Sequence, residues 1–267
     1  MSASPPAAPT PPTTTIDFPW YDAPWLRSYV GLKAKIADEA PELMGQFLDA
    51  FEVMRTRQDF EVELRRDLIT PDIHDDLRKM VAGLSYSELE FGELADFGRL
   101  VVHNHSYVNL LQRSLVPLVS EIVGEPVEPS YNFLSLYHQL GRCEVHMDAP
   151  DAKWTVDFCI DQSRPWPISF SKIQPWPETM EVKPDTWAAD IKNDPANEFQ
   201  SFTMEPGDAL VFSGSSQWHY RDPMVEPALG DFSHLLFLHY IPLGTRSAAF
   251  PAQWHERLPF LAPPTPR

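Results

Sequence analysis

The stretch GRCEVHMD, residues 141–148, ends in a histidine and an aspartate two positions apart, His146 and Asp148. Residues two apart in extended backbone point the same way, so both side chains can reach one metal ion. A second stretch, GDALVFSGSSQWH (residues 207–219), begins with turn residues, continues as an apolar run and ends at His219. In a double-sheet roll the ends of two such stretches can meet at the mouth. Together they predict a β core that carries a metal site.

The chain after Pro129 supports such a core. Short strand-like runs are separated there by turn residues, which is typical of an all-β barrel or double-sheet roll. Residues 178–200 are polar and Pro-rich without strong periodicity, so we expect a long insertion of the kind that often covers a site. The runs cover residues 132–137, 155–160, 167–170, 209–212 and 235–240.

The chain before this region has a mainly helical pattern of apolar residues. Apolar residues recur at helical spacing from 110 to 122, and Gly124 is placed to end that helix. Apolar and charged residues alternate from 60 to 64, which indicates a short strand in a mainly helical region. We therefore expect an α+β protein in which a helical region packs on the β core. Its expected parts are a disordered Pro/Ala/Thr-rich N-terminus (1–16), the helical region (17–128), the core (129–248) and a C-terminal tail (249–267).

The composition of the chain argues against several classes of function. A chain of 267 residues with 43% hydrophobic residues can bury a full core. The net charge of −17 argues against nucleic acid and against anionic membranes, because both would be repelled. No apolar run approaches the roughly 18 residues of a membrane span, and the N-terminus lacks the order of a signal peptide. We expect a soluble, cytoplasmic protein, and its two cysteines form no disulfide framework.

The residue types in the two stretches indicate which metal. Two imidazoles and one carboxylate hold iron(II) on one face and leave the opposite coordination positions open for oxygen chemistry. A His-x-Asp alone is weak, because nine histidines produce such pairs by accident. The alternative interpretation is that Asp148 caps a turn and that His219 is a surface residue beside Trp218.

A family resemblance becomes specific at these residues. Residues 137–148 and 206–223 resemble the two halves of the metal motif of the prolyl-hydroxylase-like iron(II)/2-oxoglutarate dioxygenases. The resemblance covers roughly residues 130–245 and implies a double-stranded β-helix (jelly-roll or cupin-like) core. It implies that His146, Asp148 and His219 bind iron. It also places Tyr137 on a tyrosine that often hydrogen-bonds the cosubstrate, although a core aromatic is the alternative for that position.

The sequence departs from the family at the cosubstrate. An Arg or Lys near the start of the last core strand usually pairs with the far carboxylate of 2-oxoglutarate. Here that strand begins at residues 231–235, which include neither. The nearest cation is Arg221, two residues after the distal histidine. We expect Arg221 to bind this carboxylate, with Ser233, His234 and His239 as helpers or substitutes. Arg142 is another basic candidate, although its place beside the first motif fits a solvated turn equally well.

The resemblance implies an iron(II)- and 2-oxoglutarate-dependent oxygenase that releases succinate and carbon dioxide. Its substrate is expected to be a small molecule or an amino-acid-derived compound, or else a peptidyl side chain. Relatives that halogenate replace the metal carboxylate with a small residue, so Asp148 favours hydroxylation. Two alternatives stay open: an iron oxygenase of the same fold that does not use 2-oxoglutarate, and a noncatalytic β-roll module that binds or senses a metal.

Overall fold

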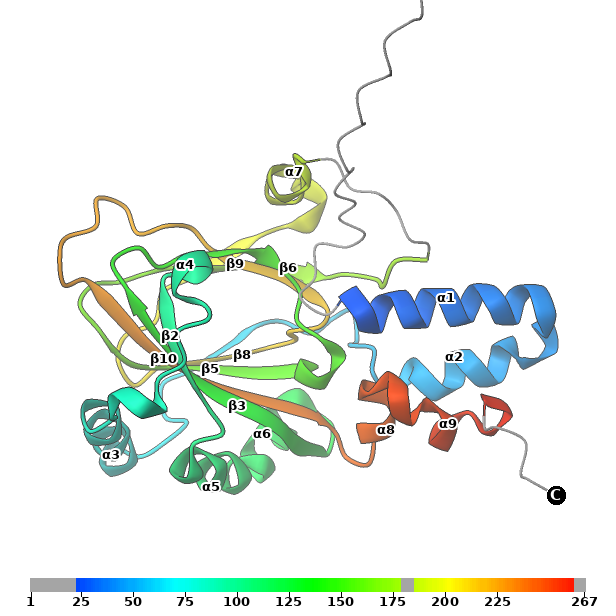
Figure 1. Ribbon diagram of the computed structural model, residues 1–267, viewed down its shortest axis with the longest axis horizontal. Helices are drawn as coiled ribbons and strands as arrows, with labels where there is room; N and C mark the ends of the chain where they lie inside the picture. The colour runs from blue at the N-terminus through cyan, green and yellow to red at the C-terminus, as the bar shows by residue number, and fades with distance from the viewer. Residues whose placement is uncertain (1–22, 179–184, 262–267) are drawn as a thin grey trace, which may run out of the picture.

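The computed structural model describes residues 23–178 and 185–261 of the chain. These residues form two antiparallel sheets with helices around them (Figure 1). The large sheet has the strand order β1-β8-β5-β10-β3-β2, and the small sheet has the order β4-β9-β6-β7. The strands are β1 (Glu63–Arg65), β2 (Arg99–His103), β3 (Val127–His138), β4 (Cys143–His146), β5 (Trp154–Gln162), β6 (Ile168–Ile173), β7 (Gln200–Phe202), β8 (Ala209–Phe212), β9 (Gln217–Arg221) and β10 (Phe232–Pro242).

Most of the helices lie in two groups (Figure 1). Helices α3, α5 and α6 cover the outer face of the large sheet, and α1, α2, α8 and α9 lie together at one end of the molecule. Helix α4 lies beside β2, and α7 lies in the expected insertion. The helices are α1 (Ala23–Glu39), α2 (Met44–Glu52), α3 (Pro71–Ala82), α4 (Leu94–Phe97), α5 (Ser106–Ser114), α6 (Val116–Val123), α7 (Trp187–Asn193), α8 (Arg246–Ala249) and α9 (Trp254–Arg257). None of the helices in the described ranges is long and apolar enough to span a bilayer.

The two faces of the large sheet have different neighbours. Strand β10 lies between β3 and β5, with Leu236 opposite Leu134 and Leu235 opposite Ser135. Leu134 and Leu236 pack with apolar residues of α5 and α6 in one buried cluster. Leu235 packs instead with residues of the small sheet, such as Ile168. Because side chains alternate along a strand, the odd-numbered residues from 131 to 137 of β3 and from 233 to 239 of β10 face the space between the sheets.

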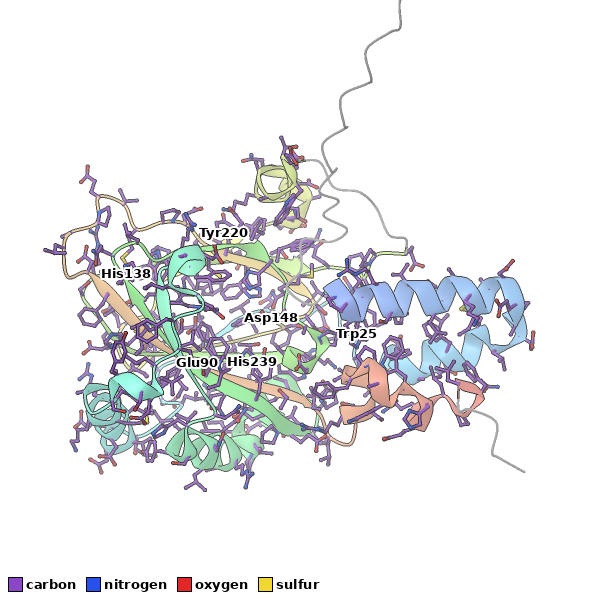
Figure 2. All side chains as sticks on the ribbon, in the orientation of Figure 1. Trp25, Glu90, His138, Asp148, Tyr220 and His239 are labelled. Carbon is purple, nitrogen blue, oxygen red and sulfur yellow. The ribbon has the colours of Figure 1, made fainter. Side chains whose placement is uncertain are left out.

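An aromatic cluster joins the first helices to the C-terminal ones. The ring of Trp25 stacks on Tyr29 at 5.4 Å and meets Trp254 edge-on at 5.7 Å. Both indoles also donate hydrogen bonds to the carbonyl oxygen of Ala248. Figure 2 shows Trp25 where these helices meet the sheets. Residues 249–261, expected to be a tail, therefore include the buried Trp254 and pack on the N-terminal helices.

The expected strand-like runs fall in β3, β5, β6, β8 and β10. The expected helical region does hold helices, but it also supplies β1 and β2 to the two edges of the large sheet. The predicted disorder of residues 1–16 lies outside the described residues, as does part of the insertion.

Candidate metal centre and cavity

Neighbouring strands of the small sheet bring the three predicted metal ligands together. His146 ends β4 and lies directly opposite His219 of β9 in the strand register. The backbone N–H of Asp148 donates to the carbonyl of Gly214 at 2.8 Å, which returns its side chain toward both rings. The Oδ1 atom of Asp148 lies 3.4 Å from Nε2 of His146 and 3.7 Å from Nε2 of His219. Within the described ranges these three side chains could hold a metal ion, with ligand atoms all within 4.8 Å of one another.

Backbone carbonyls orient both imidazoles. Nδ1 of His146 lies 2.8 Å from the carbonyl oxygen of Glu144, and Nδ1 of His219 lies 3.0 Å from that of Gln217. A carbonyl oxygen only accepts hydrogen bonds, so the Nδ1 atom of each ring carries a proton. Both Nε2 atoms therefore face the Asp148 carboxylate, where a bound metal ion would replace the Nε2 proton that interacts with the carboxylate in the metal-free protein.

The charge of Asp148 also suits a cation. Burial alone raises the pKa of this carboxyl group, but the nearby His219 and His146 rings outweigh it and hold the pKa well below its usual range. Asp148 is therefore a carboxylate at neutral pH, ready to bind a metal ion.

Gly214 is required where Asp148 turns toward the histidines. A Cβ atom at this position would lie 2.4 Å from Oδ2 of Asp148, 2.6 Å from the carbonyl of Ala152 and 2.8 Å from Oγ1 of Thr155. We expect Gly214→Ala to displace the carboxylate and to lower the free energy of unfolding by about 1–3 kcal/mol. The metal affinity, measured by titration, should fall with it. The control is Gly45→Ala, because a Cβ atom at position 45 would meet no other atom within 4 Å. Gly230→Ala is a poorer control, because the φ angle of Gly230 is +95° and a side chain there would strain the backbone. Equal metal affinity in the two variants would contradict this role of Gly214.

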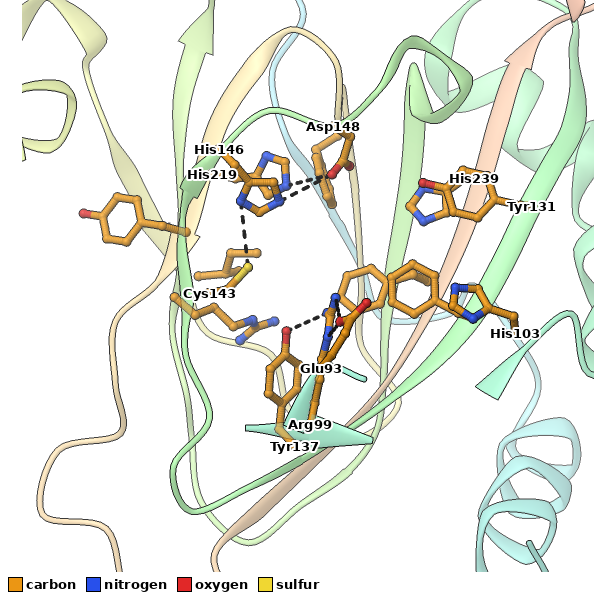
Figure 3. Close-up of a pocket in the computed structure, with 16 residues that line it drawn as sticks. Glu93, Arg99, His103, Tyr131, Tyr137, Cys143, His146, Asp148, His219 and His239 are labelled. Atoms are coloured by element: carbon orange, nitrogen blue, oxygen red, sulfur yellow. Dashed lines mark hydrogen bonds and ion pairs between the residues drawn. The ribbon is translucent and has the colours of Figure 1, made fainter. Parts of the chain in front are cut away.

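A cavity of about 210 Å³ opens beside the three ligands, between the two sheets (Figure 3). Its outer part includes the half-exposed side chains of Glu93 and His103, whereas the two metal-facing histidines are buried. Figure 3 shows the His146, Asp148 and His219 group on one side of the space, with Arg99 and Tyr137 across from it. The lining residues are Glu93, Arg99, His103, Tyr131, Phe133, Tyr137, Cys143, His146, Asp148, Ile168, Phe212, His219, Tyr220, Arg221, Phe237 and His239.

The strand register places some of the residues predicted to bind the cosubstrate in the cavity and others outside it. Arg221, Tyr137 and His239 line the cavity. Ser233 lies opposite Tyr137 and is fully buried on the same face, although it is not a lining residue. His234 lies on the other face of β10, in ring contact with Phe232, so it cannot reach the cavity.

Arg221 is held in a buried ion pair. Its Nη2 donates to Oδ2 of Asp157 at 2.8 Å, and its Nη1 donates to the carbonyl oxygen of Trp166. Burial raises the pKa of Asp157, although Arg221 opposes that effect. The guanidinium also lies over the Trp166 ring, 5.0 Å from its centroid. One edge of Arg221 is thus fixed by the protein interior, while the residue still lines the cavity.

Sequence reasoning missed a second arginine, Arg99. It lies on β2, and its Nη1 donates to the hydroxyl of Tyr137 at 2.9 Å and to Oγ of Ser135 at 3.3 Å. Its Nε and Nη2 face Oε2 of Glu93. The available signal was the alternation of Arg99, Val101 and His103 on one face of a strand, in a stretch that we expected to be helical or irregular.

Comparison with known proteins agrees with this architecture. No family model matches the sequence, and no curated protein matches it. Among solved structures, SnoK, a non-heme alpha ketoglutarate dependent carbocyclase from nogalamycin biosynthesis, matches with a TM-score of 0.55 and 12% identity, over 81% of this chain and 92% of SnoK. EctD from S. alaskensis, solved with 2-oxoglutarate and 5-hydroxyectoine, matches with a TM-score of 0.51 and 12% identity, over 78% of this chain and 79% of EctD.

HygX from Streptomyces hygroscopicus, solved with nickel, 2-oxoglutarate and hygromycin B, matches with a TM-score of 0.51 and 9% identity, over 74% of this chain and 86% of HygX. The chain therefore shares its fold with 2-oxoglutarate-dependent oxygenases, as the sequence resemblance predicts. At these identities the similarity is one of fold, so the function of this chain has to be argued from its own residues.

Proposed function

We propose that the protein is an iron(II)- and 2-oxoglutarate-dependent oxygenase that hydroxylates a small molecule. The observation that carries this proposal is the group of His146, Asp148 and His219 at one side of a cavity, with both Nε2 atoms turned toward the carboxylate. We infer that the two sheets form a double-stranded β-helix. Both histidines then lie on paired strands of its small sheet.

The residues present fit iron(II). Two imidazole nitrogens and one carboxylate oxygen form a set that leaves coordination positions open, and the cavity lies beside those positions. His239 Nε2 and Ser233 Oγ are buried and lack a hydrogen-bond partner among the described residues, as expected where a polar ligand completes a site. Bound iron supplies the oxygen chemistry, in which 2-oxoglutarate is decarboxylated to succinate and carbon dioxide. The protein contributes orientation and a cavity that limits access of water.

Arg221 is our proposed anchor for the far carboxylate of 2-oxoglutarate. It follows His219 by two residues on the same strand face, which places the two about 7 Å apart along the strand and suits a five-carbon diacid. Tyr137 lines the same part of the cavity, and Ser233, which lies opposite Tyr137 in the strand register, is a supporting donor. A guanidinium has five donors, so Arg221 can bind a carboxylate while it keeps its bonds to Asp157 and Trp166.

Hydroxylation of a small molecule is the outcome that we favour. The structures of HygX with hygromycin B and of EctD with 5-hydroxyectoine show this fold with small molecules bound. The fold also hosts an epimerase and a carbocyclase, SnoN and SnoK, so the type of oxidation depends on how the substrate is held. Asp148 retains the metal carboxylate, which favours hydroxylation over halogenation.

Binding of 2-oxoglutarate tests the proposal. Zinc-loaded protein, which is inert to oxygen, is titrated with 2-oxoglutarate by calorimetry. We expect saturable binding that weakens by about 10–100-fold in Arg221→Lys, because a charge-assisted hydrogen bond contributes about 1.5–3 kcal/mol. Arg142→Lys, at an exposed position outside the cavity, is the matched control.

If the zinc-loaded wild type does not bind 2-oxoglutarate, the oxygenase of the same fold without this cosubstrate becomes the better account. If it binds 2-oxoglutarate but Arg221→Lys and Arg142→Lys behave alike, the anchor is misassigned.

A further inference from the structure

The outer part of the cavity contains a second guanidinium that the proposed metal and cosubstrate sites do not use. We propose that Arg99 is a second carboxylate site, which binds the anionic group of the molecule to be oxidised. The substrate is then a small carboxylic acid with an aromatic or apolar body. This inference rests on the proposed function, because it assigns the substrate class of the same cavity.

The guanidinium of Arg99 is held in one orientation that suits an anion. The residue is 8% exposed, and its Nη1 is bound by the hydroxyls of Tyr137 and Ser135. The rings of Phe97 and Phe133 lie 4.9 and 5.3 Å from its guanidinium carbon. These contacts hold the plane of the guanidinium, so little side-chain entropy remains to be lost when a carboxylate binds. The remaining edge, Nε and Nη2, is the edge that matches a carboxylate in two-point pairing.

A carboxylate of the protein already occupies that edge. Oε2 of Glu93 lies 2.5 Å from both Nε and Nη2 of Arg99. The Glu93 side chain is 36% exposed and belongs to the turn that precedes α4, so it can move into water. The acid partner of Arg221 is different, because the side chain of Asp157 is fully buried. Glu93 therefore stands in for a ligand carboxylate and keeps the buried Arg99 paired until the substrate arrives.

The wall beside Arg99 is aromatic. His103, Phe133 and Phe237 form a row across β2, β3 and β10, because Phe133 lies opposite the other two in the register. The rings of Phe133 and Phe237 stack at 5.0 Å with an interplanar angle of 29°. This surface offers burial to an apolar body and few hydrogen bonds to a sugar or a peptide. It favours an acid whose remainder is apolar.

His239 adds a polar group near the metal ligands. Its Nδ1 lies 3.0 Å from Oγ1 of Thr155, which lies 3.5 Å from Oδ2 of Asp148. Its Nε2 is buried in the cavity wall and has no partner among the described residues. Burial lowers the pKa of His239 to about 4, so the ring is neutral at pH 7. A hydroxyl, carbonyl or amino group of the substrate can therefore bond to His239 while the carboxylate is held by Arg99.

The test compares acids with their uncharged amides. Protein loaded with zinc and 2-oxoglutarate is titrated with benzoate, phenylacetate and 3-phenylpropionate, and with the amide of each. We expect at least one acid to bind about tenfold or more tightly than its amide, and Arg99→Met to remove that preference. Arg142→Met is the control and should keep it. Glu93→Gln should strengthen acid binding, because the competing internal carboxylate is gone. Arg99→Met removes the cation beside the half-exposed Glu93 and the donor to the buried hydroxyls of Tyr137 and Ser135. A denaturation curve therefore checks that the variant folds, and Arg99→Lys, which keeps the charge without the two-point edge, should weaken the preference for acids in a second variant.

Three results would overturn the inference: no acid exceeding its amide in the wild type, an unchanged preference in Arg99→Met, or loss of 2-oxoglutarate binding in Arg99→Met with retention in Arg221→Lys. In the last case Arg99 would be the cosubstrate anchor, and the oxygenase proposal would stand. If the wild type does not bind 2-oxoglutarate at all, the oxygenase proposal fails by itself. The preference for acids can then still be scored in protein loaded with zinc alone.

Discussion

His219→Ala is expected to weaken iron(II) binding by more than about 100-fold. Replacing even a group that only orients a metal ligand typically costs about 10–100-fold in affinity, and here a ligand itself is lost. The other two ligands cannot compensate, because the ring of His219 lies 4.2 Å from that of His146 and supplies one of the two nitrogens that face Asp148. The measurement is an anaerobic titration of iron(II), with the bound metal counted after gel filtration.

His255→Ala is the matched control for this prediction. His255 is an exposed residue of α9, and its Nδ1 bonds to the carbonyl of Ala252. Its replacement removes an imidazole from the protein without touching the cavity. Equal iron affinity in His255→Ala and His219→Ala would show that iron binds elsewhere. Iron bound by the wild type with no succinate formed from 2-oxoglutarate under any substrate would favour a module that only binds the metal.

Arg221→Met is expected to lower the free energy of unfolding by about 3–5 kcal/mol at pH 7. Asp157 is fully buried, and removing its partner leaves a buried carboxylate without a counter-charge. Part of this penalty is avoided if Asp157 takes up a proton, because burial already raises its pKa. Chemical denaturation of the two proteins measures the difference.

The pH dependence of this loss has a definite sign. The pKa of Asp157 is raised in the folded protein above the unfolded value of about 4, so ionisation of Asp157 costs stability as pH rises through the folded pKa. Near pH 4 the carboxyl group is more protonated in the folded protein than in the unfolded chain, so less buried charge remains and the loss in Arg221→Met should shrink. The double variant Asp157→Leu/Arg221→Met should recover most of the stability, since apolar residues often replace a buried pair without cost. An equal loss at pH 4 and pH 7 would contradict this account of the pair.

Much of the core could be predicted because its signals are local. Apolar runs bounded by turn residues mark β5, β8 and β10, and alternation along a strand is enough to set the faces of residues within it. The metal ligands could be predicted for the same reason. His146 and Asp148 are two apart, and His219 ends an apolar run after a Gly-Asp turn, so each half of the site carries its own pattern.

The remaining site residues depend on long-range pairing. Arg99 enters the cavity only because β2 pairs with β3 at the edge of the large sheet, and no local pattern specifies that partner. His234 and His239 could not be separated either, because the face of a strand residue depends on register and bulges. In β10 the register with β3 shifts between Leu238 and Tyr240. A shift of one residue reverses which side chains face the core.

The central claim is that His146, Asp148 and His219 hold one metal ion whose open positions take 2-oxoglutarate. Anomalous diffraction from crystals grown without oxygen, with manganese(II) in place of iron and with 2-oxoglutarate, tests it most directly. The account predicts one metal peak within bonding distance of Nε2 of His146, Nε2 of His219 and a carboxylate oxygen of Asp148, with 2-oxoglutarate completing the coordination. A metal peak that lacks any of these three ligands, or 2-oxoglutarate bound away from the metal, would contradict it.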